Sequence, residues 1–115
     1  MRFVKLNLSD KEKYFWTSHS KIKMRQYRLS EQRVLRVLRR PDRKEEGIAE
    51  GTLAAMQITG TKKHPTEIWL MYVLLKKPLG IKIISTWRYP ARSPINQPPP
   101  VPQDILEQLD DILKE

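Results

Sequence analysis

The chain has 115 residues, a formal net charge of +9, no cysteine and only two histidines, His19 and His64. This length suits one domain with a core of moderate size, and the composition excludes disulfides, thiolate metal sites and an obvious ligand cluster for a metal or cofactor. No stretch approaches the roughly 20 apolar residues that a membrane span requires, so we expect a cytoplasmic protein without a membrane partner.

The positive charge is concentrated in the first part of the chain. Residues 1–43 contain 13 Lys or Arg and 4 Asp or Glu, whereas residues 44–115 contain 9 of each class. A basic excess gathered in one region is typical of proteins that contact phosphate backbones. A solvated surface that aids solubility is the alternative, and charge alone does not separate the two.

The first sixteen residues combine a weak strand signal with an aromatic cluster. Alternating apolar residues predict a short edge strand within 1–8. Tyr14, Phe15 and Trp16 come directly before a helix start, where aromatic rings can anchor a helix to the core. An exposed ring among the three would instead be able to stack on a base.

Two short helices are predicted next, each with a clear N-terminal cap. Thr17 or Ser18 can cap the first helix, and Ser30 can cap a second helix that begins at Glu31. Pro41 disfavours helical geometry in the residue before it and therefore ends the second helix. The pattern predicts two helices in tandem over 17–40.

His19 and Lys23 are the residues of chemical interest on the first helix. They are four residues apart and therefore share a face. His19 falls in the first turn, where the positive end of the helix dipole disfavours imidazolium, so we expect a neutral ring. The residues available to pack inward are Ile22, Met24 and Tyr27.

The second helix separates an apolar stripe from a strongly basic side. Val34, Leu35 and Leu38 form the stripe, with Val37 at its margin. Arginine offers a planar, permanently charged fork that suits phosphate oxygens, although acidic neighbours would pair with one or two of these side chains. The predicted nucleic-acid-facing surface consists of Arg25, Arg28, Arg33, Arg36, Arg39, Arg40 and Arg43.

After Pro41 the periodicity becomes strand-like. Two glycines within 45–52 predict a hairpin or bulge, and apolar segments at 53–59, 66–75 and 81–90 predict three strands joined by short turns. The middle segment is almost wholly apolar, as expected for a central strand covered on both faces. His64 lies in the turn between the first two strands and is expected to be exposed.

The C-terminal part divides into a linker and a helix. Residues 93–103 are rich in proline and predict a semi-rigid linker. Residues 104–115 carry a net charge of −4 and place Ile105, Leu109 and Ile112 on one stripe, which predicts an acidic amphipathic helix. This helix could pack on its own chain, mediate a homodimer or bind another protein, and we favour packing on the same or a neighbouring subunit.

The predicted class is therefore α+β. Two N-terminal helices pack on an antiparallel meander of three or four strands within a basic domain over 1–92. The linker and the C-terminal helix follow this domain.

A short motif in the first helical region invites comparison with a family. The pattern is His19, Ser20, Lys23, Met24, Tyr27, Leu29 and Ser30, followed by Val34, Leu38, Pro41 and a final TWRYP. Over roughly 14–90 it resembles small uncharacterised prokaryotic domains with a His-Ala-x-x-Arg-Met-x-x-Arg-Gly-Ile-Ser signature. These domains are similar in fold to RelE- and BrnT-type toxins and to barnase-like ribonucleases. The chain departs from the signature at Ser20, Lys23, Tyr27 and Arg28.

The resemblance implies an RNA-interacting domain and a possible toxin-like endoribonuclease that needs no metal. Such chemistry requires a base, an acid and cations that stabilise the charge developing on phosphate. His19 is the candidate base or acid, and Lys23 and Arg88 are the candidates to hold the phosphate. Tyr89 could donate a proton or stack on a base, provided that the last strand ends beside the first helix, as the resemblance implies.

Two alternatives from other classes remain open. A non-catalytic module would use the same basic helices to bind RNA or DNA, with Trp69 and Trp87 serving as core or as stacking surface. A protein-interaction domain would use the C-terminal helix for recognition and its basic side for an acidic partner, for example an antitoxin-like protein.

Overall fold

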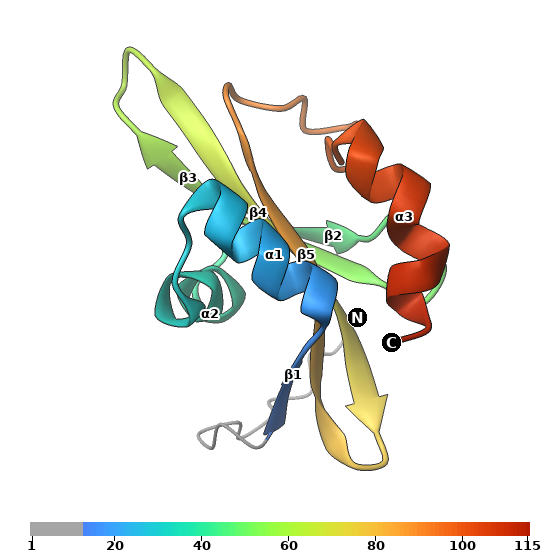
Figure 1. Cartoon of the computed structure of the whole chain (residues 1–115). Coiled ribbons are helices and arrows are strands. Elements are labelled where there is room, and N and C mark those ends of the chain that lie inside the picture. Colours follow the sequence, from blue (N-terminus) through green and yellow to red (C-terminus); the bar gives the residue numbers. More distant parts are fainter. Residues whose placement is uncertain (1–12) are drawn as a thin grey trace.

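The computed structural model describes residues 13–115, which form a five-stranded sheet with helices on both faces (Figure 1). The elements follow one another as β1 (Tyr14–Trp16), α1 (Ser18–Tyr27), α2 (Glu31–Arg39), β2 (Arg43–Glu46), β3 (Leu53–Gly60), β4 (Pro65–Lys76), β5 (Leu79–Tyr89) and α3 (Gln103–Leu113). The α+β class is confirmed. The strand predicted within 1–8 lies outside the described residues.

The sheet has the order β1-β5-β4-β3-β2 and is mixed. Strands β2 to β5 pair antiparallel, and β1 pairs parallel with β5. The predicted meander is correct for β3, β4 and β5, with β4 at the centre, but the prediction of three or four strands was wrong because β1 and β2 add the two edges. The sequence did not predict β1 because its three aromatic residues are too few to show a period. It did not predict β2 because the charged RKEE segment has an unusual composition for a strand.

Both predicted N-terminal caps are confirmed. The Thr17 hydroxyl accepts a 3.0 Å hydrogen bond from the Ser20 amide, and the Ser30 hydroxyl accepts a 3.0 Å bond from the Arg33 amide. These bonds satisfy amides that have no partner within a first helical turn. They fix the points at which α1 and α2 begin.

One face of the sheet is covered by α1 and α2. Val34 and Val37 are fully buried in the core beneath α2, whereas Leu35 and Leu38 are only partly buried. The interpretation of Val37 as a marginal residue was therefore wrong. Ile22, predicted to pack inward, is 53% exposed, whereas Met24 on the same helix is buried.

The opposite face is covered by α3, which Figure 1 shows in red on the other side of the sheet from α2. Its stripe of Ile105, Leu109 and Ile112 is buried in a second core cluster. Trp69 and Trp87 stack in this cluster with ring centroids 6.0 Å apart, which makes both rings core residues. The C-terminal helix thus packs on its own chain.

Helix α1 lies along β5, on the side where β1 has ended. The Thr17 amide donates to the Ile83 carbonyl at 3.2 Å, and the Thr17 hydroxyl donates to the Ile84 carbonyl at 3.0 Å. The strand register is irregular there, because Met71 pairs with Ser85 and the next residue of β4 pairs with Ile83. The start of the helix therefore satisfies backbone groups at an otherwise open sheet edge. The helix contacts the core beneath α2 through Met24 and contacts α3 through Lys23.

Candidate functional site

His19 lies in the first turn of α1, against β5. Its Nε2 is 3.0 Å from the Ser85 hydroxyl, and both residues are buried. Burial and the neighbouring charge of Lys23 lower the pKa of His19, while a hydrogen bond with Gln108 and the carboxylates of Glu115 and Asp104 act in the opposite direction. The ring is therefore neutral near pH 7, with burial as the main cause.

Lys23 lies one turn further along α1 and is also covered. Its side chain is 8% exposed, forms an ion pair with Asp104 of α3 and donates a 2.9 Å hydrogen bond to Gln26. The hydrogen bond from Lys23 lowers the pKa of Asp104. At the start of α1, the Glu115 carboxylate accepts two 2.7 Å bonds from the amide and hydroxyl of Ser18. The C-terminal segment therefore closes over the His19–Lys23 pair.

Arg88 and Tyr89 are adjacent in sequence but lie on opposite faces of the sheet. Arg88 pairs with Ile68 of the α1–α2 core, and its Nε donates a 2.9 Å bond to the Tyr27 carbonyl. Tyr89 pairs with Glu67 and packs against the core beneath α3. His19 and Lys23 are thus neighbours, and Arg88 and Tyr89 cannot both lie on their side of the sheet. Ser85, which bonds to His19, pairs with Met71 of the core beneath α3, so Arg88 lies on the other face.

Three arginines lie on the α1–α2 face near Gln57, and we call Arg33, Arg36 and Arg88 the arginine surface. Gln57 bonds to Arg33 and to the Arg36 carbonyl, and it lies across Ile68 from Arg88. Burial and the charges of Arg36 and Arg88 lower the pKa of Arg33. Arg33 donates a 2.6 Å bond to the neutral side chain of Gln57, whose own amide donates to the Arg40 carbonyl at 2.8 Å. Gln57 therefore fixes α2 on β3 without neutralising any of these charges.

The other arginines of the two helices are exposed. Arg28 caps the C-terminus of α1 in the left-handed conformation, with φ 56°, next to the Tyr27 carbonyl that Arg88 binds. Within 13–115, the ion pairs involve Lys23, Arg43 and Arg92 rather than these arginines. The other exposed arginines of the two helices and their C-terminal caps are Arg25, Arg28, Arg39 and Arg40.

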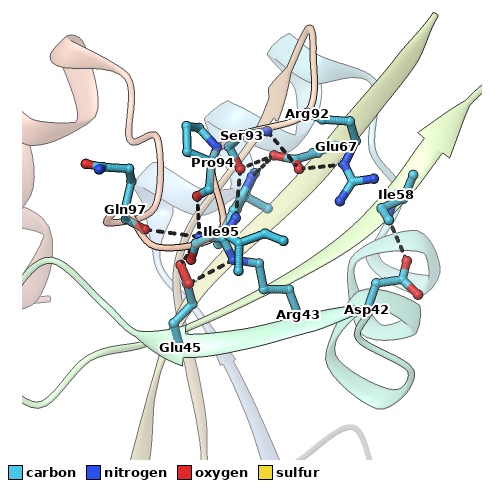
Figure 2. Close-up of polar contacts among 11 residues, drawn as sticks. Asp42, Arg43, Glu45, Ile58, Glu67, Arg92, Ser93, Pro94, Ile95 and Gln97 are labelled. Carbon is cyan, nitrogen blue, oxygen red and sulfur yellow. Dashed lines mark hydrogen bonds and ion pairs between the residues drawn. The ribbon is translucent and has the colours of Figure 1, made fainter. Parts of the chain in front are cut away.

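Arg43 lies away from this surface, although the sequence grouped it with the other arginines. Its side chain is only 11% exposed, and its guanidinium lies 5.2 Å from the centre of the Trp69 ring. Figure 2 shows it among the residues that follow β5. Its hydrogen-bond acceptors are the Glu45 carboxylate, the Ser93 hydroxyl and the carbonyls of Pro94, Ile95 and Gln97.

Glu67 is the buried acid of the same network, and the sequence prediction missed it. The carboxylate accepts bonds from Trp69 Nε1 at 2.9 Å, from the hydroxyl and amide of Ser93 at 2.6 and 3.1 Å, and from Arg92 at 3.2 Å. Burial acts to raise the pKa of Glu67, but these hydrogen bonds together hold it below its usual value. The sequence signal that could have identified Glu67 is its position as the single acid within the apolar run TEIWLMYVLL.

Comparison with known proteins finds no matching family model, no similar curated protein and no similar solved structure. Over residues 13–115, no helix is long and apolar enough to cross a membrane. The same residues contain no group of three His, Asp or Glu side chains that would hold a metal ion. The assignment of a function therefore depends on the geometry and charge of this chain.

Proposed function

We propose that the chain is an RNA-binding domain whose arginine surface contacts the phosphate backbone. The observation that carries the proposal is the arrangement of Arg33, Arg36 and Arg88 around Gln57, which bonds to Arg33 and to the Arg36 carbonyl and lies across Ile68 from Arg88. The three arginines have no carboxylate partner among the described residues. Like charges held together without a counter-charge raise the local potential, and a bound polyanion relieves their repulsion.

The distribution of acidic residues supports the same surface. The carboxylates of α3 lie on the opposite face of the sheet, Glu67 is enclosed in its own network, and α2 carries a single acid, Glu31, in its first turn. A chain with one basic and one acidic face is oriented by the field of an approaching polyanion. RNA is the first choice of ligand because of the resemblance to toxin-type ribonuclease folds, and DNA of the same sequence is the comparison ligand.

The test is the RNA affinity of the double variant Arg36→Ala/Arg88→Ala. We expect an affinity loss of about tenfold or more, because each lost phosphate contact also removes counterion release. The matched control is Lys76→Ala/Lys77→Ala, which removes two exposed charges from the turn between β4 and β5. Equal affinities of the two double variants would overturn the proposal.

Endoribonuclease activity is the second candidate, and one observation favours it. His19 has a lowered pKa, and Lys23 of the same helix face lies beside it, as a general base and a cation should. Both are buried and Lys23 is paired with Asp104, so catalysis would require the C-terminal segment to move away. Its test is incubation with an RNA pool. Cleavage by the wild type that disappears in His19→Ala, with RNA affinity retained, would establish it, and intact RNA bound by the wild type would exclude it.

A further inference from the structure

The two hairpins of the meander each end in a pair of lysines. Lys62 and Lys63 lie in the turn between β3 and β4, and Lys76 and Lys77 lie at the turn between β4 and β5, so the two pairs mark opposite ends of the sheet. Arg88 pairs with Ile68, which is three residues from the start of β4. The Lys62–Lys63 turn is therefore at the same end as the arginine surface.

This turn is rigidly built. The Thr61 amide donates to the His64 carbonyl at 3.2 Å, and the His64 amide donates to the Thr61 hydroxyl at 3.0 Å. Gly60 has φ +83°, and a Cβ there would lie 2.4 Å from the His64 carbonyl oxygen, so only glycine fits. These contacts therefore define the backbone conformation from which the two lysines project.

The turn also projects beyond the rest of the sheet. Strand β5 ends at Tyr89, opposite Glu67, whereas β3 and β4 continue pairing to Gly60 and Pro65. Figure 1 shows this hairpin extending past the body of the molecule, at the end where α1 finishes. Lys62 and Lys63 are exposed and form no ion pair in the described part of the chain.

The spacing indicates two separate phosphate contacts. Arg33 binds Gln57 of β3, which lies three residues, or about 10 Å along an extended strand, before the end of that strand at Gly60, and Lys62 lies in the turn beyond it. Two basic groups at this separation on a rigid frame suit a ligand whose own phosphates are held at fixed positions. A duplex has such phosphates, whereas a flexible single strand must be ordered first.

Over the residues that the structure describes, the arginine surface also lacks the exposed Phe, Tyr or Trp side chains on which the bases of a single strand stack. Proteins that bind single strands combine basic grooves with exposed aromatic rings, whereas double-stranded RNA is recognised by its shape, phosphates and 2′-hydroxyls. Among the Phe, Tyr and Trp side chains of residues 13–115, Phe15 is exposed, and its pairing with Lys82 places it towards the Lys76–Lys77 end of the sheet. Tyr27, beside Arg88, is partly buried, and the exposed imidazole of His64 lies in the β3–β4 turn and not on the arginine surface. The arginine surface is thus suited to a backbone and not to unstacked bases.

We infer that the β3–β4 turn is a second nucleic-acid contact and that the ligand is double-stranded RNA. The arginine surface and the Lys62–Lys63 pair would contact phosphates on either side of one groove of the duplex. This inference rests on the proposed function. It adds the class of RNA and a contact element outside the two helices. The lysines act as exposed point charges on phosphate, and the turn supplies their position.

The test compares three ligands: an RNA duplex of about 20 base pairs, one of its single strands, and the DNA duplex of the same sequence. The length of the duplex exceeds the roughly 16 base pairs that a double-strand-binding domain spans. Lys62→Ala/Lys63→Ala should weaken duplex RNA binding by about tenfold and reduce the salt slope by about two, with little change for the single strand. The control Lys76→Ala/Lys77→Ala replaces two lysines by alanine in the same way, and it should bind as the wild type does.

Each outcome has a separate meaning. If the wild type binds none of the three nucleic acids, the proposed function itself fails. If it binds RNA but Lys62→Ala/Lys63→Ala matches Lys76→Ala/Lys77→Ala, the second contact is wrong while the proposed function stands. Tighter binding of the single strand, or equal binding of the DNA duplex, would overturn double-stranded RNA as the ligand class.

Discussion

Arg43 and Arg88 are both arginines of the same sheet, but their surroundings are opposite. Arg43 is nearly buried, and its guanidinium donates to a carboxylate, a hydroxyl and three carbonyls. Arg88 is exposed, donates to a single carbonyl and lies across Ile68 from Gln57, the residue that binds Arg33. The comparison indicates that an arginine stabilises this fold where several acceptors surround it, whereas an exposed arginine with a single acceptor keeps most of its donors free.

The largest effect should come from Arg43→Ala. The substitution leaves Glu45 and three carbonyls without their shared donor, so the free energy of unfolding should fall by about 3 kcal/mol. Arg88→Ala should change it by less than about 0.5 kcal/mol, because its site is exposed. Urea unfolding monitored by tryptophan fluorescence gives both values, and similar losses for the two variants would remove the distinction between them.

A smaller, pH-dependent effect is expected from Glu67. Because its folded-state pKa lies below the ordinary value of 4.5, its stabilisation is present above that value and is lost as pH falls through the folded-state pKa. Glu67→Gln should therefore be less stable than the wild type at neutral pH, and the difference should shrink in acid. Urea unfolding at a series of pH values measures this, and a constant difference would contradict it.

The smallest effect on stability should be a gain, in Arg28→Gly. Arg28 has φ 56°, a conformation that glycine adopts without the cost of about 1 kcal/mol that other residues incur. We expect a higher melting temperature together with weaker RNA binding. Arg28→Asn is a second variant that tolerates this conformation and, like Arg28→Gly, lacks the charge, so both should bind RNA more weakly. Unchanged RNA affinity in both variants would place Arg28 outside the binding surface.

The sequence predicted those parts of the fold whose signals are local. Thr17 and Ser30 cap helices through bonds to amides three residues away, and the apolar run of β4 is itself the mark of a central strand. The strands β1 and β2 were not predictable in this way. Each is only three or four residues long and is stabilised by a partner, residues 81–83 or 53–56, that is distant from it in the chain.

The candidate site shows the same limit. The helical spacing of His19 and Lys23 correctly placed them on one face, but only the tertiary structure shows that Asp104, 81 residues away, covers that face. The charge of Arg43 and Arg88 is identical in sequence, and the acceptors that distinguish them come from remote segments. Alternation within β5 puts Arg88 and Tyr89 on opposite faces, which weakens any model that uses both in one centre.

The most direct test of the central claim is a salt titration of RNA binding. The logarithm of the wild-type association constant should fall steeply and linearly with the logarithm of salt concentration, and Arg33→Ala/Arg36→Ala/Arg88→Ala should reduce that slope by about two to three. Lys76→Ala/Lys77→Ala should keep the wild-type slope. A wild-type affinity that does not respond to salt, or equal slopes for the wild type and the triple variant, would contradict the assignment of the arginine surface to the phosphate backbone.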